Sequence, residues 1–282
     1  MSRYGDLVSA NIAYTVRDPK HDEEKPYFVR YDTGGAIPDS NTSSVTQPVS
    51  IHNFRSKEGP ENFQDYGFSV ERLDRPWTET LFDELEDIKD VYYSEIQRLL
   101  QRKFPNASGV YVLEHGLRKR HAKFPTLEKD LKIEHMQPST LAHIDCSLQF
   151  AIQTAKSAFN IPPGECRRVL SINLWKSLQG PGNDWPLALC DRRTMNQKLD
   201  TNVADIVYYN RFTENEVVYY NPEHEWYYVK DLQDDEIIML VQKDSDDENG
   251  GGVAHTSFHN PLADEGTKPR SSIELRCYVV FA

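Results

Sequence analysis

The chain has 282 residues, of which 38% are hydrophobic, and a formal net charge of −12. No run approaches the roughly 18 apolar residues that a membrane-spanning helix needs, and nucleic acids and anionic membranes are polyanions that repel an acidic protein. We therefore expect a globular, cytoplasmic protein that binds neither nucleic acid nor membrane, while its oligomeric state stays open.

The first part of the chain predicts an arm followed by one long helix. Residues 1–75 are rich in Pro, Gly, Asp, Ser and Asn, which favours an N-terminal arm or lid packed on a core. Apolar residues then recur at three- and four-residue spacing from residue 78 to 104, so residues 76–106 are expected to hold a supporting helix. Residues 107–282 form the expected core of a single domain spanning residues 1–282.

The core predicts one more helix and a series of strands. Residues 147–159 have a helical pattern that ends at a Pro-Pro-Gly turn. Runs rich in β-branched and aromatic residues follow at 167–175, 205–209, 216–220, 225–229, 236–241, 253–258 and 273–281. Closely spaced strands after an early helix are typical of a mainly β protein with flanking α-helices. We expect a double-stranded β-helix, the jelly-roll or cupin-like fold.

Three residues have the spacing of a metal site. Side chains at positions i and i+2 of a strand share a face, so His143 and Asp145 can point at one centre while Ile144 packs away from it. Such a pair alone is a weak signal. His255, in a strand-like run near the end of the chain, is the candidate third ligand, because two histidines and a carboxylate form a facial triad that leaves three positions open on iron.

An arginine opens the last predicted strand, fifteen residues after His255. A guanidinium binds a carboxylate through two charge-assisted hydrogen bonds. Ser272 lies on the same strand face as Arg270, so the two side chains are suited to bind a dicarboxylate. The alternative is a surface salt bridge from Arg270 to its acidic surroundings. The basic residues between Arg118 and Lys123 are interpreted as a solvated charged segment.

A series of motifs extends over nearly the whole chain. They are VSIHNFR at residues 49–55, INLWKSLQGPGNDWPLALCD at 172–191, EHEWYY at 223–228, QKDS at 242–245, AHTSF at 254–258 and PRSSIELR at 269–276. With these motifs the chain resembles the fungal gibberellin-desaturase-like hydroxylase/desaturase family, which also takes in relatives of the cephem methoxylases.

The resemblance implies an Fe(II)- and 2-oxoglutarate-dependent oxygenase, an oxidoreductase on a double-stranded β-helix. Such an enzyme uses molecular oxygen to hydroxylate, desaturate or oxidatively cyclise a small-molecule substrate of specialised metabolism. The resemblance also implies that His143, Asp145 and His255 bind the metal and that Arg270 binds 2-oxoglutarate. Arg276 shares the strand face of Arg270 and is the competing anchor. The resemblance assigns no role to Arg55, because relatives tend to carry a small or acidic residue where this chain has Phe54.

Asn173 is a further candidate for binding the co-substrate or the substrate. Ser171, Asn173 and Trp175 alternate with aliphatic residues, so one face of this predicted strand is polar and aromatic. That face either looks into the barrel or belongs to an edge strand with its polar side in water.

Two other functions share parts of this pattern. A metal-free jelly-roll binding protein or an inactive relative would keep the barrel without using the triad. A zinc-dependent hydrolase could use the same three ligands, although Arg270 would then have no purpose. The identity of the substrate and the choice between hydroxylation, desaturation and cyclisation stay open at this point.

Overall fold

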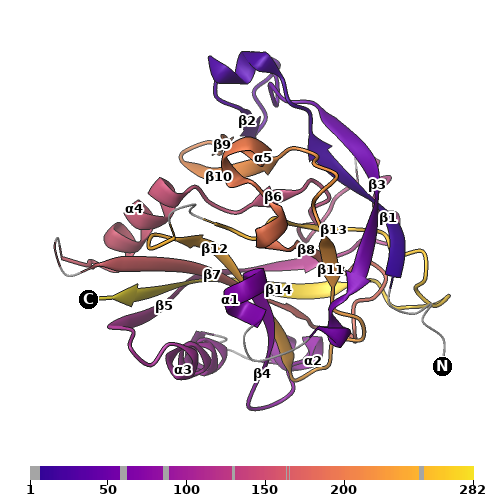
Figure 1. The fold of residues 1–282 in the computed structure, drawn as a ribbon. Helices are drawn as coiled ribbons and strands as arrows, with labels where there is room; N and C mark the ends of the chain where they lie inside the picture. Colours follow the sequence, from indigo (N-terminus) through magenta and orange to yellow (C-terminus); the bar gives the residue numbers. More distant parts are fainter. Residues whose placement is uncertain are drawn as a thin grey trace.

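The computed structural model describes residues 7–57, 62–84, 89–128, 131–162, 164, 166–247 and 251–282. Within them the chain forms two β-sheets packed face to face, with helices below and beside the smaller sheet (Figure 1). Trp175 and Leu240 of the smaller sheet meet Leu189 and Tyr227 of the larger sheet in a shared core. Among the described helices, none has the length and apolar character needed to cross a membrane.

The smaller sheet has five strands, and each neighbouring pair is antiparallel. Its order is β4 (Phe68–Arg72), β12 (Glu236–Asp244), β7 (Arg168–Ser177), β14 (Ser271–Phe281) and β5 (Gly109–Lys119). Alternation along the central strand β7 sends Ile172 and Leu174 toward the helices, while Asn173 and Trp175 face the larger sheet. The edge-strand alternative is therefore wrong, because β7 is central and Asn173 is only 1% exposed.

The larger sheet has nine strands. Its order is β1 (Leu7–Thr15), β3 (Ser44–Asn53), β11 (Trp226–Tyr228), β8 (Leu187–Cys190), β13 (His255–Ser257), β6 (His143–Ile144), β10 (Phe212–Val218), β9 (Thr201–Val207) and β2 (Tyr27–Val29). β1 pairs with β3 along its whole length, and β3 runs parallel to β11. Much of the segment expected as an arm or lid thus forms part of this sheet.

Helices cover the outer face of the smaller sheet, where Ile96 and Leu100 pack against Leu174 and Leu275. The helical segments are α1 (Asn62–Tyr66), α2 (Glu79–Glu84), α3 (Ser94–Lys103), α4 (Leu148–Ala158), α5 (Gln197–Asp200), the π-helical η4 (Lys89–Tyr93) and the 3-10 turns η2 (Pro19–Asp22), η3 (Phe54–Ser56) and η5 (Arg192–Thr194). The predicted long helix corresponds to α2, η4 and α3, and residues 85–88 of it lie outside the described residues. The predicted second helix is α4, capped by Ser147.

The predicted fold class is confirmed, because each of the seven predicted strand runs falls on a strand of this two-sheet architecture. Two long strands, β3 and β5, lie outside the predicted runs. Along β5 nearly all side chains are half buried on both faces, so this strand shows no alternation. β3 does alternate between exposed and more buried positions, but it contains Pro48 and few apolar residues. Pairing with neighbouring strands decides their conformation.

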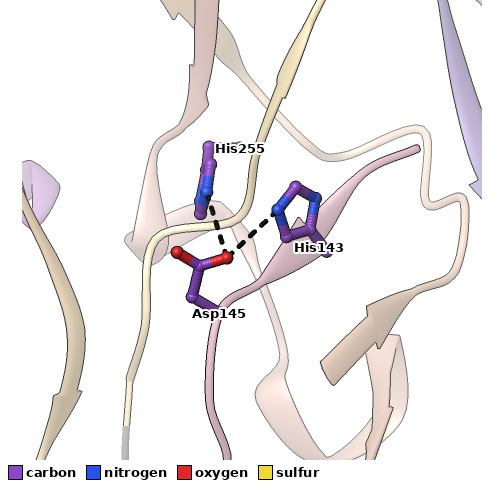
Figure 2. A group of neighbouring side chains, drawn as sticks. All are labelled: His143, Asp145 and His255. Carbon is purple, nitrogen blue, oxygen red and sulfur yellow. Dashed lines mark ion pairs between the residues drawn. The ribbon is translucent and has the colours of Figure 1, made fainter. Parts of the chain in front are cut away.

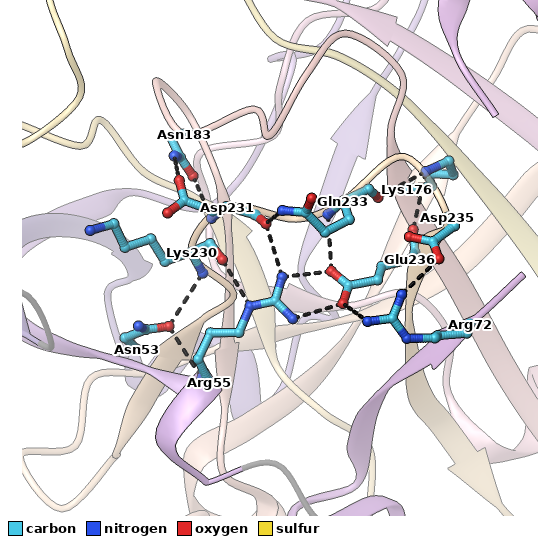
Figure 3. A network of polar contacts seen from close by, with 10 residues as sticks. All are labelled: Asn53, Arg55, Arg72, Lys176, Asn183, Lys230, Asp231, Gln233, Asp235 and Glu236. Carbon is cyan, nitrogen blue, oxygen red and sulfur yellow. Dashed lines mark hydrogen bonds and ion pairs between the residues drawn. The ribbon is translucent and has the colours of Figure 1, made fainter. Parts of the chain in front are cut away.

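A polar network ties the end of β3 to the start of β12 (Figure 3). Arg55 donates from Nη1 and Nη2 to the two carboxylate oxygens of Glu236, at 2.9 and 2.6 Å, and from Nε to the carbonyl of Lys230 at 2.9 Å. The buried Lys176 donates from Nζ to the carbonyl of Glu236 at 3.2 Å. Arg55, to which the resemblance assigned no role, is therefore a structural residue.

We predict that Arg55→Ala lowers the free energy of unfolding by about 2–3 kcal/mol, because the Glu236 side chain is only 5% exposed and loses charge-assisted hydrogen bonds. Arg72→Ala is the matched control. Arg72 is 68% exposed and reaches Glu236 at 3.5 Å, so its loss should cost less than about 1 kcal/mol. Urea unfolding measures both variants, and equal losses would contradict the assignment.

The same network predicts a pH dependence of stability. Burial raises the pKa of Glu236, but hydrogen bonds from Arg55 and from the backbone of Gln233 outweigh it and hold the pKa below its ordinary 4.5. A carboxyl with a depressed folded-state pKa contributes stability that is complete above the unfolded pKa and is lost as pH falls through the folded pKa. The stability deficit of Arg55→Ala should therefore shrink as the pH of the unfolding experiment falls below 4.5.

Candidate metal centre

Strand pairing brings two histidines together in the larger sheet. β6 lies beside β13, and His143 is the direct register partner of His255. Their ring centroids lie 4.5 Å apart. Ile144, the next residue of β6, points to the opposite face and packs in an apolar cluster with Ala188 and Trp226. The strand alternation expected from the sequence is thus present around His143.

Asp145 completes the group just after β6 (Figure 2). Asp145 Oδ1 lies 3.2 Å from His143 Nε2 and 3.9 Å from His255 Nε2. One ligand atom from each of the three residues lies within 4.8 Å of the other two. The structure therefore places the three predicted ligands around one centre, although they are separated by 110 residues of sequence between Asp145 and His255.

The imidazole orientations suit metal binding. The Nδ1 atoms face the carbonyls of Leu141, at 2.7 Å from His143, and of Val253, at 3.1 Å from His255. Since a carbonyl can only accept, each Nδ1 donates, and each neutral ring presents the lone pair of Nε2 toward Asp145. Two imidazole nitrogens and one carboxylate oxygen are the donor set of an iron facial triad, so these residues fit Fe(II).

Burial and neighbouring charges favour the metal-binding protonation state of Asp145 and of His255, whereas at His143 burial lowers the pKa and the adjacent Asp145 carboxylate raises it, with a net increase. Burial would raise the pKa of Asp145, but the charge of Arg276 outweighs it and holds the pKa well below its usual range. Burial and the neighbouring His143 ring lower the pKa of His255. A neutral imidazole beside an ionised carboxylate is the state that binds a divalent metal.

The second oxygen of Asp145 is held by other side chains. Asn173 Nδ2 donates to Asp145 Oδ2 at 2.5 Å and to Glu274 Oε1 at 2.7 Å, and Arg276 Nη2 lies 3.6 Å from the same Oδ2. This leaves Oδ1 directed at the histidines. Asn173 was expected to bind the co-substrate or substrate, whereas its amide N–H groups here are directed at two carboxylates, which points to a role in orienting Asp145.

Arg270 lies at the start of β14, deep in the protein. Its side chain donates from Nε to Ser272 Oγ at 3.1 Å and from Nη1 to the carbonyl of Trp185 at 2.9 Å, and its guanidinium lies 4.9 Å from the centre of the Trp175 ring. The residue is 2% exposed, so the surface salt bridge considered as an alternative is wrong. Burial lowers the pKa of Arg270 to about 9, which leaves it charged at neutral pH.

Arg270 forms no ion pair with any carboxylate among the described residues. Arg276 differs, because it pairs with Glu114 at 3.0 Å and lies near Asp145, and its side chain is 41% exposed. Sequence reasoning missed Arg118, which is the register partner of Ser272 and whose charge acts on Arg270. Arg118 belongs to the basic segment up to Lys123, which was interpreted from the sequence as solvated. A buried cation beside a second guanidinium calls for an anion.

Comparisons with known proteins agree with this geometry. The structure of the iron and alpha-ketoglutarate-dependent endoperoxidase NvfI matches with a TM-score of 0.82 and 20% identity over 100% of both chains, which shows a shared fold. The hydroxylase/desaturase CTB9 of Cercospora beticola is 28% identical over 268 residues, covering 88% of this chain and 81% of its own. The alpha-ketoglutarate-dependent dioxygenase phiK of a fungal species is 27% identical over 281 residues, covering 90% and 95%.

Fold and candidate centre together define the class of jelly-roll proteins of the iron- and 2-oxoglutarate-dependent dioxygenase type. The family described as "Oxidoreductase/YMDC permease-like domain" matches residues 12–280, and the chain belongs to this family. The predicted resemblance to fungal hydroxylase/desaturases and 2-oxoglutarate-dependent dioxygenases is confirmed.

We predict that His143→Ala, Asp145→Ala and His255→Ala each abolish stoichiometric Fe(II) or Mn(II) binding, because a centre with open positions cannot spare a protein ligand. Isothermal titration under anaerobic conditions measures binding, and circular dichroism checks the fold. His224→Ala and His259→Ala are the controls and should retain the metal, since His224 instead bonds to Asp200 at 3.1 Å. Unchanged metal affinity in any triad variant would refute that ligand.

Proposed function

We propose that His143, Asp145 and His255 bind Fe(II), that Arg270 binds 2-oxoglutarate, and that the chain uses both to oxidise a small molecule with molecular oxygen. The observation that carries this proposal is the buried triad, whose three ligand atoms lie within 4.8 Å of one another. Three protein ligands on one face leave the opposite face of a six-coordinate metal for the reactants. Iron and 2-oxoglutarate, when bound, supply the activation of oxygen, with release of succinate and carbon dioxide.

The protein contributes orientation and charge. Asn173 and Arg276 hold one oxygen of Asp145, so the other is directed at the metal position and Asp145 binds through one atom. This keeps a further coordination position free for a reactant. Arg270 supplies the positive charge for the distal carboxylate of 2-oxoglutarate, and Ser272, which accepts from Arg270 Nε, keeps its own O–H to donate to the same carboxylate.

The reaction outcome is set by the placement of the substrate. Relatives of this chain carry names that include hydroxylase/desaturase and Fe(II)/2-oxoglutarate-dependent dioxygenase, and the structural neighbour is named an endoperoxidase. Hydroxylation, desaturation and oxidative cyclisation differ in which substrate atom lies near the metal, so a shared centre serves all of them. We propose that the substrate is a small molecule of specialised metabolism.

The compartment and the domain organisation are also proposals. We propose a cytoplasmic location, which fits a net charge of −12 that disfavours binding to anionic membranes. We also propose one oxygenase domain over residues 1–282, because β1 and β3 from the first part of the chain pair into the same sheet that carries β6 and β13.

Succinate release tests the proposed function. The Fe(II)-loaded protein should convert labelled 2-oxoglutarate to succinate, slowly without substrate and faster with it, and the zinc-loaded protein should not. Hydrolytic activity with zinc and no succinate with iron would favour the zinc hydrolase instead. A protein that binds no stoichiometric Fe(II) would be the metal-free jelly roll.

We predict that Arg270→Ala weakens 2-oxoglutarate binding by about two to three orders of magnitude, because the removed charge leaves a buried carboxylate unpaired, a loss of about 3–5 kcal/mol. Metal affinity should change little. Arg270→Lys should recover part of the loss, since an ammonium cannot reproduce two-pronged binding. Titration of 2-oxoglutarate into Mn(II)-loaded protein gives the measurement.

Arg276→Ala is the necessary comparison for this prediction. Arg276 pairs with Glu114 and Asp145, so its loss should affect the metal carboxylate more than the co-substrate. If Arg276→Ala weakens 2-oxoglutarate binding and Arg270→Ala does not, the anchor is misassigned by six residues while the oxygenase function stands.

A further inference from the structure

A cavity of about 290 Å³ lies beside the metal carboxylate, between α4, β14 and the start of β10. Asp145 and Asn173 line it, whereas Arg270 and Ser272 do not. Its volume is at the lower end of the range for small-molecule sites. The cavity therefore reaches the metal centre from a different direction than the proposed 2-oxoglutarate anchor.

The outer walls of this cavity are largely apolar. Phe150 of α4, Phe212 of β10 and Tyr278 of β14 contribute aromatic rings, and the centroids of Phe150 and Phe212 lie 6.4 Å apart. Phe212 is 57% exposed. An exposed ring at a cavity wall gains by covering the hydrocarbon face of a bound molecule.

The charges of the cavity are mostly compensated by the protein itself. Arg276 pairs with Glu114 at 3.0 Å and lies 3.6 Å from Asp145. Arg211 lies at the rim, where it is exposed, and its guanidinium is 4.9 Å from the centre of the Tyr208 ring. Water screens a charge at such a position. The interior thus favours an uncharged ligand.

One buried donor that lines the cavity lacks a partner. Gln242 is 0% exposed, and its Oε1 accepts from the backbone N–H of Asp145 at 2.8 Å. That bond fixes which end of the amide is oxygen. Its Nε2 has no hydrogen-bond partner among the described residues. A buried amide donor left unpaired costs free energy, and an acceptor atom on a ligand removes that cost.

We propose that this cavity takes the substrate and that Gln242 selects it, by donating from Nε2 to an acceptor oxygen of an uncharged, largely apolar molecule. The inference rests on the proposed function, because a molecule in this cavity can be oxidised only if Asp145, which lines it, helps to bind the metal. Gln242 links the two: one end of its amide holds the backbone of Asp145, and the other binds substrate oxygen. Carbonyl, ether or hydroxyl oxygen next to the carbon to be oxidised fits this arrangement.

The test uses two fluorinated probes of equal size on protein loaded with Mn(II) and 2-oxoglutarate. Para-fluoroacetophenone carries an acceptor carbonyl, and para-fluorocumene carries a methyl group in place of that oxygen. Fluorine NMR measures their affinities, and Mn(II) broadens the signal of a probe bound near the metal, whereas Zn(II) does not. The ketone should bind about three- to tenfold more tightly, the worth of one hydrogen bond, and should show the Mn(II) broadening.

Gln242→Glu is the decisive variant in its ionised form, because a carboxylate keeps an oxygen to accept from Asp145 N–H and has no donor, so both probes are measured from neutral pH up to pH ~9. The preference for the ketone should disappear. For the wall, Phe212→Ala should weaken both probes by a similar factor. Tyr209→Ala on the same hairpin is its control, since Tyr209 is 87% exposed and does not line the cavity, and it should leave both affinities unchanged.

Binding of Mn(II) and 2-oxoglutarate is measured first on every variant, so failure of the proposed function is recognised separately. With both bound, an unchanged ketone preference in Gln242→Glu overturns the assignment of Gln242. Equal affinities of the two probes for the unsubstituted protein, or no Mn(II) broadening of either, overturns the proposal as a whole.

Discussion

His143 and His255 face each other across one antiparallel strand pair, and the metal centre depends on that register. Because side chains alternate along a strand, a slip by one residue would bring Ile144 into the interior and turn His143 into the apolar cluster behind the sheet. The neighbouring strands oppose such a slip, since β8 pairs with β13 and β10 pairs with β6. Burial of Ile144 at 0% exposure adds an apolar contribution that is lost in any other register.

Strand β14 and the residue before it supply several of the polar side chains between the two sheets. Arg270, Ser272, Glu274, Arg276 and Tyr278 alternate with Ile273, Leu275, Cys277 and Val279, which pack under the helices. At about 3.3 Å per residue, Arg270 and Arg276 stand roughly 20 Å apart along the strand. Arg270, the proposed 2-oxoglutarate anchor, lies at the N-terminal end of β14, and Tyr278 lines the cavity near its C-terminal end. The proposed co-substrate and substrate positions therefore lie at different points along one strand.

Buried polar groups fall into two kinds in this protein. Glu236 is matched by Arg55, and Lys243 by Glu216 at 2.7 Å, and these pairs connect segments of the fold. Arg270 forms no direct ion pair among the described residues, although the charges of Glu274 and Asp184 act on it, and the donor of Gln242 has no partner there. A satisfied buried group stabilises the structure, whereas an unsatisfied one is a cost that a ligand can remove. This distinction separates structural from candidate functional residues more clearly than residue type does.

Local pattern in the sequence determined the strand runs of the core, the helix at Ser147 and the shared face of His143 and Asp145, because each depends on periodicity within a few residues. That the polar face of β7 is interior was decided by the central place of β7 in its sheet. The series of motifs in chain order indicated the protein family. The strand β5 lacks alternation and β3 contains Pro48 and few apolar residues, so pairing with β14 and β1 decides their conformation. Only the tertiary structure distinguished the buried Arg270 from the partly exposed Arg276, placed Asn173 against Asp145, and brought Arg118 beside Arg270 and Gln242 to the cavity. Those differences are set by burial and by contacts between residues far apart in the chain, which no local pattern encodes.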